Sequence, residues 1–179
     1  MLIRPYRPED AAGVVNTVKT VFLEYGFGWY PDTYCSDVYS VEDTYGPPDN
    51  WFWVVEDPAG EVVGCAGLCL QDRLPGEPGD MVEIDGDNRV AGTDCEIVRL
   101  YVLPKARGHG LGRRLSETVM EQARAVGRTH IEVWSDKKLT HAHAMYERLG
   151  AFRVGDRICP GDPDEAWEWG FVLPVASQP

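Results

Sequence analysis

The chain has 179 residues, 44% of them hydrophobic, and a formal net charge of −12 at pH 7. This length suits one domain whose core is large enough to fold without disulfides or structural metals. The acidic balance argues against nucleic acid and anionic membranes as partners and favours cationic ones, although solubility alone also explains such a charge. No apolar run approaches the ~20 residues of a membrane span, and the N-terminus lacks a signal-peptide core, so we expect a cytoplasmic protein.

Cysteine and histidine spacing gives no sign of a metal site. The five cysteines form no Cys-x-x-Cys pair, and three of them fall in expected strands, where small buried thiols are common. His141 and His143 lack an acidic or thiol partner at helical spacing from both. We therefore predict that no metal is bound.

The first third of the chain is predicted to form a strand and two helices. Residues 2–6 suit a short strand, and apolar residues from Val14 to Tyr25 recur at helical spacing after Asp10, a suitable N-cap. Gly26 and Gly28 end that helix. A second helix is expected from Asp32 or Thr33 to about Thr44.

Two strands and a polar segment follow. Residues 51–56 and 62–70 are rich in β-branched and aromatic residues and are joined by a turn, which predicts a hairpin. Residues 71–93 are polar and rich in glycine and proline, with a possible small hairpin at 81–90. Long segments of this kind are usually functional or mobile, and the sequence favours neither.

The central feature is the stretch from Glu96 to Gly112. Residues 96–103 predict a buried strand that Pro104 ends, and Arg107-Gly-His-Gly-Leu-Gly112 follows. Three glycines at alternate positions allow successive N–H groups to face one anion at a helix start. Arg113 and Arg114, which the helix dipole disfavours there, suggest a bound polyanion. A solvated helix start with a tight turn is the alternative, and the spacing fits neither a P-loop nor a dinucleotide fingerprint.

The C-terminal half alternates helices and strands. A helix at about 110–126 and a strand at 130–134 predict a parallel pair with a right-handed crossover. The glycine-rich loop then lies at the carboxyl end of the first strand, where α/β sheets bind ligands. A short helix follows Thr140, and strands are expected at 151–156 and 166–173.

Three of these segments together resemble the GCN5-related N-acetyltransferase (GNAT) superfamily. Arg107–Gly112 is similar to its acyl-CoA motif, Gln/Arg-x-x-Gly-x-Gly/Ala, and residues 100–104 resemble its central strand. Residues 142–150 resemble its tyrosine helix, and the resemblance spans about 94–157. It implies one N-acetyltransferase domain over residues 1–175, with an insertion at 71–93. The implied fold is mixed α/β, the acyl-CoA N-acyltransferase fold: a mostly antiparallel central sheet with one parallel strand-helix-strand unit and flanking helices.

The resemblance also implies an acetyl-CoA site. Backbone N–H groups near Tyr101 to Leu103 would polarise the thioester carbonyl, and Val102 and Leu103 would meet the pantetheine arm. The pyrophosphate would be held by Arg107, Gly108, His109, Gly110, Leu111, Gly112 and Arg113. The family often has an asparagine seven residues before its tyrosine, where this chain has Leu139.

The resemblance assigns two catalytic residues. Glu96 is the expected general base, acting through a water, with a strand-edge ion pair to an arginine such as Arg99 as the alternative. Tyr146 is the expected acid toward the leaving thiolate, with packing on a helix face as the alternative. The first two helices of the family cover the acceptor, so Tyr25, Trp29, Tyr30 and Tyr34 are expected to line its pocket or to pack on the sheet.

These features predict an acetyl-CoA-dependent N-acetyltransferase for a small-molecule primary amine. A protein N-terminus or lysine is the alternative acceptor. A CoA-binding sensor module without turnover is the alternative from another class. A homodimer is possible, as is common in the family.

Overall fold

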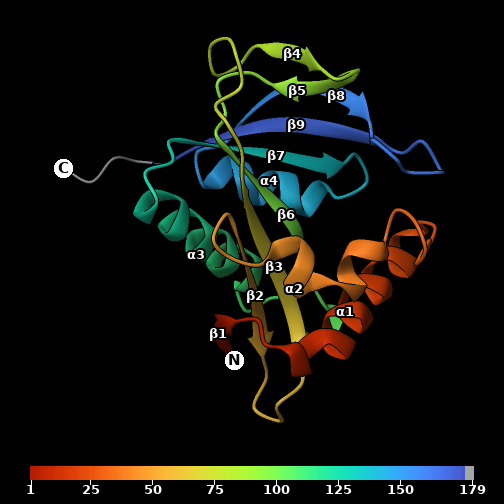
Figure 1. Ribbon diagram of the computed structural model, residues 1–179. Helices are drawn as coiled ribbons and strands as arrows, with labels where there is room; N and C mark the ends of the chain where they lie inside the picture. Colours follow the sequence, from red (N-terminus) through yellow and green to blue (C-terminus); the bar gives the residue numbers. More distant parts are fainter. Residues whose placement is uncertain (176–179) are drawn as a thin grey trace.

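The structure is a computed structural model and describes residues 1–175. Its centre is a sheet of seven strands in the order β1-β2-β3-β6-β7-β9-β8 (Figure 1). Every neighbouring pair is antiparallel except β6 and β7. This arrangement confirms the expected mostly antiparallel sheet with one parallel unit. The strands are β1 Leu2–Pro5, β2 Asn50–Glu56, β3 Val62–Leu70, β6 Cys95–Val102, β7 His130–Asp136, β8 Phe152–Ile158 and β9 Trp167–Pro174.

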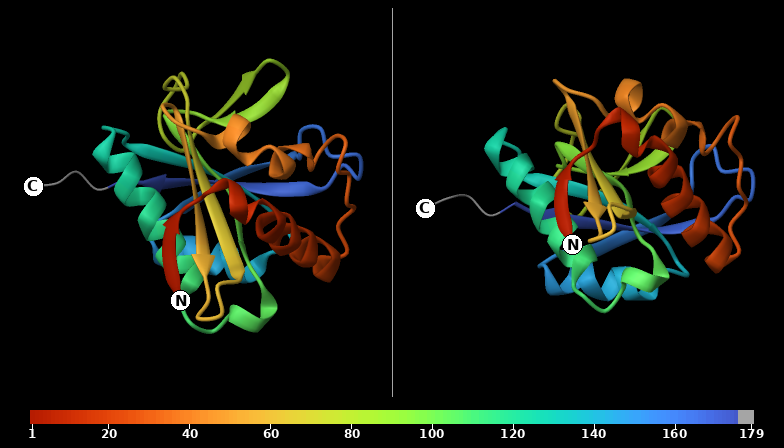
Figure 2. Two further views of the ribbon diagram at one scale, coloured as in Figure 1. Left: turned by 60° about the horizontal axis from the view of Figure 1, so that its bottom comes forward. Right: turned by 90° about the horizontal axis from the view of Figure 1, so that it is seen from below.

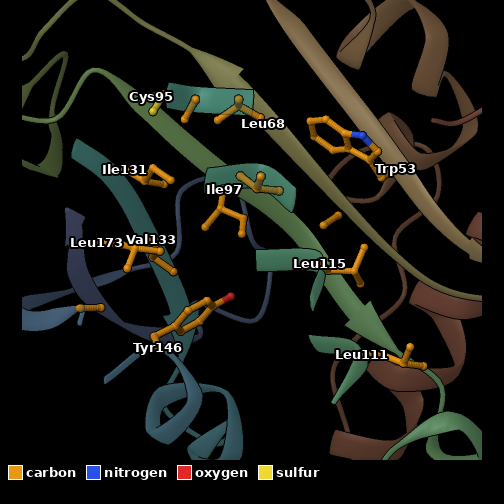
Figure 3. Close-up of a cluster of buried hydrophobic side chains, with 14 of the residues drawn as sticks. Trp53, Leu68, Cys95, Ile97, Leu111, Leu115, Ile131, Val133, Tyr146 and Leu173 are labelled. Carbon is orange, nitrogen blue, oxygen red and sulfur yellow. The ribbon is translucent and has the colours of Figure 1, made fainter. Parts of the chain in front are cut away.

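Helices cover both faces of the sheet and define two cores (Figures 1 and 2). Helices α1 (Ala11–Tyr25) and α2 (Val41–Tyr45) bury Val14, Val18 and Val41 against one face. Helices α3 (Leu111–Ala125) and α4 (Thr140–Arg148) cover the other, where Leu115 and Tyr146 belong to the larger core in Figure 3. Three short 3-10 helices span Pro8–Asp10, Ser36–Tyr39 and Pro104–Ala106. Among residues 1–175, no helix is both long and apolar enough to cross a membrane.

The predicted second helix is largely wrong. Residues 31–35 form turns, a 3-10 helix spans Ser36–Tyr39, and α2 includes only Val41–Tyr45. Tertiary contacts explain the difference, because the guanidinium of Arg99 binds this segment. Its Nη2 donates to the carbonyl of Tyr34 at 2.8 Å, and its Nε donates to Asp37 at 2.7 Å. Buried charge pairing therefore overrides local helix propensity here.

The segment 71–93 contains the hairpin that the sequence suggests. Strands β4 (Met81–Ile84) and β5 (Asp87–Val90) pair as a separate antiparallel sheet. The hairpin packs over β8 and β9, as the top of Figure 1 shows. Arg157 of β8 donates from Nη1 to the carbonyl of Asn88 at 3.2 Å. The hairpin is thus attached to the C-terminal strands of the main sheet.

A buried carboxylate also ties this hairpin to the parallel strand pair. Glu132 of β7 is fully buried. Its Oε1 accepts hydrogen bonds from Arg89 Nε at 3.0 Å, from the Val90 N–H at 2.8 Å and from Trp134 Nε1 at 2.6 Å. A buried charge with several charge-assisted donors is satisfied, whereas removing it leaves Arg89 without its closest carboxylate.

We therefore expect Glu132→Ala to lower the free energy of unfolding by about 3–5 kcal/mol, the range for breaking one side of a buried ion pair. Glu147→Ala is the matched control, because Glu147 is 51% exposed and forms only a 3.4 Å surface pair with Arg153. Such pairs contribute about 0–1 kcal/mol. Urea unfolding of both variants and wild type gives the comparison. A similar loss for both would show that the buried network contributes little.

Candidate active site

Strands β6 and β7 separate in the middle of the sheet. They pair only where Cys95–Ile97 lies beside Ile131–Val133, although both strands continue beyond this point. A bulge in β6 accompanies the separation, because Arg99 and Leu100 together face the single residue Ala66 of β3. In Figures 1 and 2 the strands β7, β9 and β8 run across the direction of β2 and β3. The sheet thus has two halves that diverge beyond the short parallel pairing.

Arg99 lies at this bulge in a strained backbone conformation. Its φ is 50°, which is uncommon outside glycine. Its guanidinium binds Asp37 and lies 5.2 Å from the centre of the Tyr34 ring. The partner of Arg99 is therefore Asp37 on the α1–α2 side, and not Glu96 as the alternative interpretation of the sequence supposed. The Arg99 side chain thus links the bulge of β6 to the segment that contains Tyr34 and Asp37.

A cavity of about 740 Å³ lies along the glycine-rich loop and is named here the loop cavity. Gly108 and Gly110 have φ values of 82° and 70°, and a Cβ at either position would meet no atom within 4 Å. In the described part of the chain, the backbone N–H groups of residues 108–113 donate to no protein acceptor. These donors meet the positive end of α3, an arrangement that binds anions. The predicted residues that line this cavity are Tyr101, Val102, Arg107, Gly108, Gly110, Leu111, Gly112 and Arg113.

Arg107 is held at the edge of the loop cavity. Its two Nη atoms donate to the carboxylate of Glu24 on α1, both at 2.6 Å, and its Nε donates to the Val102 carbonyl at 3.1 Å. Its guanidinium lies 5.9 Å from the centre of the Tyr25 ring. The end of α1 is thereby joined to the loop, and Tyr25, predicted for the acceptor pocket, lines the loop cavity.

Two predicted cofactor residues lie outside this lining. Leu103 is buried in the core, and its N–H donates to the Val63 carbonyl at 2.9 Å, so that group is already engaged. His109 is exposed, with Nδ1 3.0 Å from the carbonyl oxygen of Arg107. Neither side chain lines the loop cavity.

A second cavity of about 420 Å³ lies where the strands diverge and is named the cleft cavity. It shares Leu100, Tyr101, Leu139 and Ala142 with the loop cavity, so the two adjoin one another. Leu139, at the position of the expected asparagine, thus stands in their common wall. The cleft cavity is also lined by aromatic and charged side chains, among them Phe22, Tyr34, Arg99, Trp134, Asp136, Tyr146 and Glu168.

Tyr146 reaches the cleft cavity from α4. The residue is buried, its ring packs 6.1 Å from that of Phe171, and Figure 3 shows its hydroxyl pointing away from α4. In the described residues the hydroxyl has no protein hydrogen-bond partner. Burial raises the pKa of Tyr146 well above its ordinary value. The phenol therefore remains protonated near neutral pH and available as a proton donor.

Glu96 lines neither of these cavities. Its side chain is 24% exposed, and its carboxylate lies 3.5 Å from Nη2 of Arg89, beside Glu132 on the neighbouring strand. Burial and the charge of Glu132 raise the pKa of Glu96 to about 7, while Arg89 opposes this rise. The pKa suits a general base, whereas the position is set back from the cavity walls.

The remaining predicted acceptor residues have different positions. Tyr34 lines the cleft cavity, and its hydroxyl lies 3.0 Å from Sγ of Cys159. Tyr30 donates to Asp164 at 2.7 Å on the surface, and Trp29 packs edge-on against Phe22. Trp29 and Tyr30 line neither cavity. No motif in the sequence indicates Trp134, Asp136 and Glu168, which enter the wall from β7 and β9.

Comparison with known proteins agrees with this architecture. A sequence profile of the acetyltransferase (GNAT) family matches residues 18–151. The uncharacterized N-acetyltransferase YjgM of Escherichia coli K12 is 32% identical over 162 residues, which cover 87% of this chain and 85% of that protein. A GNAT-family acetyltransferase of Staphylococcus aureus Mu50 has a TM-score of 0.74 at 15% identity, covering 98% of this chain and 99% of that one. An aminoglycoside 6'-N-acetyltransferase complexed with coenzyme A has a TM-score of 0.68 at 15% identity, covering 100% and 99%. Because the profile spans most of the chain and the E. coli protein is similar over nearly its whole length, the chain belongs to the acetyltransferase (GNAT) family.

Proposed function

We propose that the protein transfers the acetyl group of acetyl-CoA to a primary amine of a small molecule. The observation that carries this proposal is that the loop cavity and the cleft cavity adjoin at Leu100, Tyr101, Leu139 and Ala142. One cavity offers anion-binding N–H groups, and the other has the buried phenol of Tyr146 in its wall. A carrier and an acceptor can therefore meet at the shared wall, and proximity alone contributes about 7–11 kcal/mol to such a reaction.

The loop cavity fits the chemistry of coenzyme A. The N–H groups of residues 108–113, which donate to no acceptor in the described part of the chain, suit the pyrophosphate. Arg107 and Arg113 also line the cavity, although Glu24 and Glu117 already pair with them. Apolar side chains, including Leu111 and Met145, line the same cavity and suit the uncharged pantetheine arm. Bound there, acetyl-CoA supplies an activated thioester carbonyl. Val102, predicted to meet the arm, also lines this cavity.

The chain offers groups for both proton transfers. Tyr146 is assigned as the acid toward the leaving sulfur, because its hydroxyl is protonated and has no hydrogen-bond partner among residues 1–175. Two carboxylates qualify to take the amine proton. Glu96 has a pKa raised to about 7 by burial and by Glu132, and would act through a water. Glu168 has the more direct position, because it lines the cleft cavity.

The size of the cleft cavity favours a small acceptor over a protein side chain presented on a large surface. Pockets for small molecules span about 300–1,000 Å³, and this cavity is about 420 Å³. The aminoglycoside 6'-N-acetyltransferase of similar fold bears the name of a small-molecule acceptor class. These points support a small amine as the substrate.

The test is thiol release from acetyl-CoA in the presence of a panel of alkyl amines, amino sugars, and peptides with a free N-terminus or lysine. We expect release above the hydrolysis background with at least one small amine and formation of the acetylated amine by mass spectrometry. Acetyl-CoA binding by calorimetry without any amine-dependent release would instead indicate a CoA-binding sensor. Release with peptides alone would assign a protein acceptor.

A further inference from the structure

Two carboxylates face each other in the wall of the cleft cavity. Asp136 of β7 and Glu168 of β9 are directly opposite partners in the antiparallel pair, and both line the cavity. Like charges in this position destabilise a sheet. Among the described residues no lysine or arginine side chain lies within ion-pair distance of Asp136. Its Oδ1 accepts a hydrogen bond from the backbone N–H of Lys138 at 2.7 Å. Within the described residues the charge of Asp136 is therefore not neutralised by an ion pair, which favours a cation beside it.

Glu168 has an ion-pair partner, Arg157, and a further contact with the Cys159 thiol. Nε of Arg157 donates to its Oε2 at 3.1 Å, and both side chains are nearly buried. Arg157 is itself immobilised, because its guanidinium lies 3.9 Å from the centre of the Trp134 ring and donates to the Asn88 carbonyl of the β4–β5 hairpin. The hairpin thus holds the arginine that orients Glu168 in the cavity.

We propose that Asp136 and Glu168 bind a positively charged aliphatic amine in the cleft cavity, and that Glu168 takes the proton that this amine must lose. This inference rests on the proposed function and assigns its acceptor class and base. Glu168 is preferred to Glu96 because it shares the cavity with Tyr146, whereas Glu96 lies beside Arg89 and Glu132 outside that wall. An amine between Glu168 and the thioester needs no relay through a second site.

The proposed acetyl transfer conserves protons and charge. Glu168 takes one proton from R–NH₃⁺, and the nitrogen lone pair then attacks the thioester carbonyl carbon to form the C–N bond. The C–S bond breaks, its electron pair goes to sulfur, and sulfur takes the proton of the Tyr146 hydroxyl. The second proton of the nitrogen restores that hydroxyl, and Glu168 passes its proton to solvent. The products are the amide, the free thiol and one proton.

The surroundings of Glu168 suit this role. Burial raises the pKa of Glu168 above its ordinary value, Asp136 adds to the rise, and Arg157 and the Cys159 thiol oppose it. On β6, burial raises the pKa of Tyr101 and of Glu96, and the charge of Glu168 adds to both rises. Arg99 opposes the rise at Tyr101, and Arg89 opposes that at Glu96. The other charged groups of the cavity wall are Arg99, Lys137, Lys138, Asp162 and Asp164. A base with a raised pKa must lose its proton before it acts, so activity increases as the pH rises through that pKa.

The test compares Glu168→Gln with Glu96→Gln in pH–rate profiles, with hexylamine as a cationic acceptor and aniline as a neutral one. We expect Glu168→Gln to lower kcat for hexylamine by about 10²–10⁴-fold and to abolish the rise of kcat with pH. Glu96→Gln should retain that rise at a lower pH, because it removes a negative charge near Glu168. Asp136→Asn should raise the KM for hexylamine roughly 10-fold and leave that for aniline unchanged.

A further variant separates loss of the base from loss of folding. Glu168→Asp preserves the partner of Arg157, so it should keep a pH-dependent rise even if Glu168→Gln fails to fold. Wild-type kcat and pH dependence in Glu168→Gln, or their loss in Glu96→Gln, would overturn the assignment of the base. Acetylation of aniline but not hexylamine would overturn the substrate class.

If wild type binds acetyl-CoA yet acetylates no amine, the proposed function fails, and the carboxylate pair is then judged by hexylamine binding. In calorimetry, weaker binding by Glu168→Gln and Asp136→Asn than by wild type supports the site. Equal binding, or none by wild type, rejects it.

Discussion

Tyr146→Phe is expected to lower kcat by about 10²–10⁴-fold, the usual contribution of a positioned acid or base, with the Kd of acetyl-CoA nearly unchanged. The variant loses only the hydroxyl. Its ring still packs against Phe171, and no protein hydrogen bond in the described residues is lost. Because burial raises the pKa of Tyr146, wild-type kcat should not fall as the pH rises toward 9. The measurements are steady-state kinetics and calorimetry with acetyl-CoA.

Tyr39→Phe is the matched control for this experiment. Tyr39 is 52% exposed and lines neither the loop cavity nor the cleft cavity. Its loss of a hydroxyl should leave kcat at the wild-type value. If Tyr146→Phe also keeps the wild-type kcat, the tyrosine has only a packing role and another group protonates the sulfur. Equal decreases in both variants would instead indicate a general structural effect.

The loop cavity was largely predictable, because its chemistry is local in sequence. Arg107–Gly112 are contiguous, and the N–H groups of residues 108–112 belong to glycine conformations and the start of one helix. The Arg107 N–H instead donates to the Pro104 carbonyl. Such a feature depends little on how the rest of the chain packs. Leu103 was assigned to the same site, but it follows the end of β6 and its side chain packs in the core. The sequence predicts the segment, and the backbone geometry decides which of its side chains line the cavity.

The cleft cavity depends on contacts between distant segments. Asp136 and Glu168 lie opposite one another only because of the register between β7 and β9. A shift of one residue would turn one of them to the other face of the sheet, and no local pattern specifies that register. Trp29 and Tyr30 were expected near the acceptor because the first two helices of the family cover it, and neither lines the cleft cavity.

Arg99 carries a sequence signal that points to a distant partner. A charged residue within an apolar strand needs a buried partner, and here that partner is Asp37, 62 positions away. The same contact explains why the segment around Asp37 is not the regular helix that its caps suggested. One buried guanidinium thus accounts for both the bulge beside the cavity and the error in the predicted helix.

Gly110→Asp is expected to reduce acetyl-CoA affinity by at least about 100-fold without unfolding the protein. Gly110 is the N-cap of α3 with φ 70°, and a Cβ there meets nothing within 4 Å. Aspartate tolerates this backbone region better than most residues and is a favoured N-cap, so the fold should persist. Its carboxylate would stand where the proposed site holds the pyrophosphate. Two like charges 4 Å apart near a protein surface repel by about 4 kcal/mol, which exceeds the expected loss.

Two further variants separate charge from strain in this experiment. Gly110→Asn adds a side chain of nearly the same shape without the charge, so its affinity should fall less than that of Gly110→Asp. Gly60→Asp adds the same charge at φ 85° in the β2–β3 turn, where a Cβ also meets nothing within 4 Å, and it should bind acetyl-CoA normally. Calorimetry on folded protein, checked by circular dichroism, measures all three. Wild-type affinity in folded Gly110→Asp would place the pyrophosphate elsewhere, because a carboxylate at the N-terminus of α3 repels a neighbouring anion.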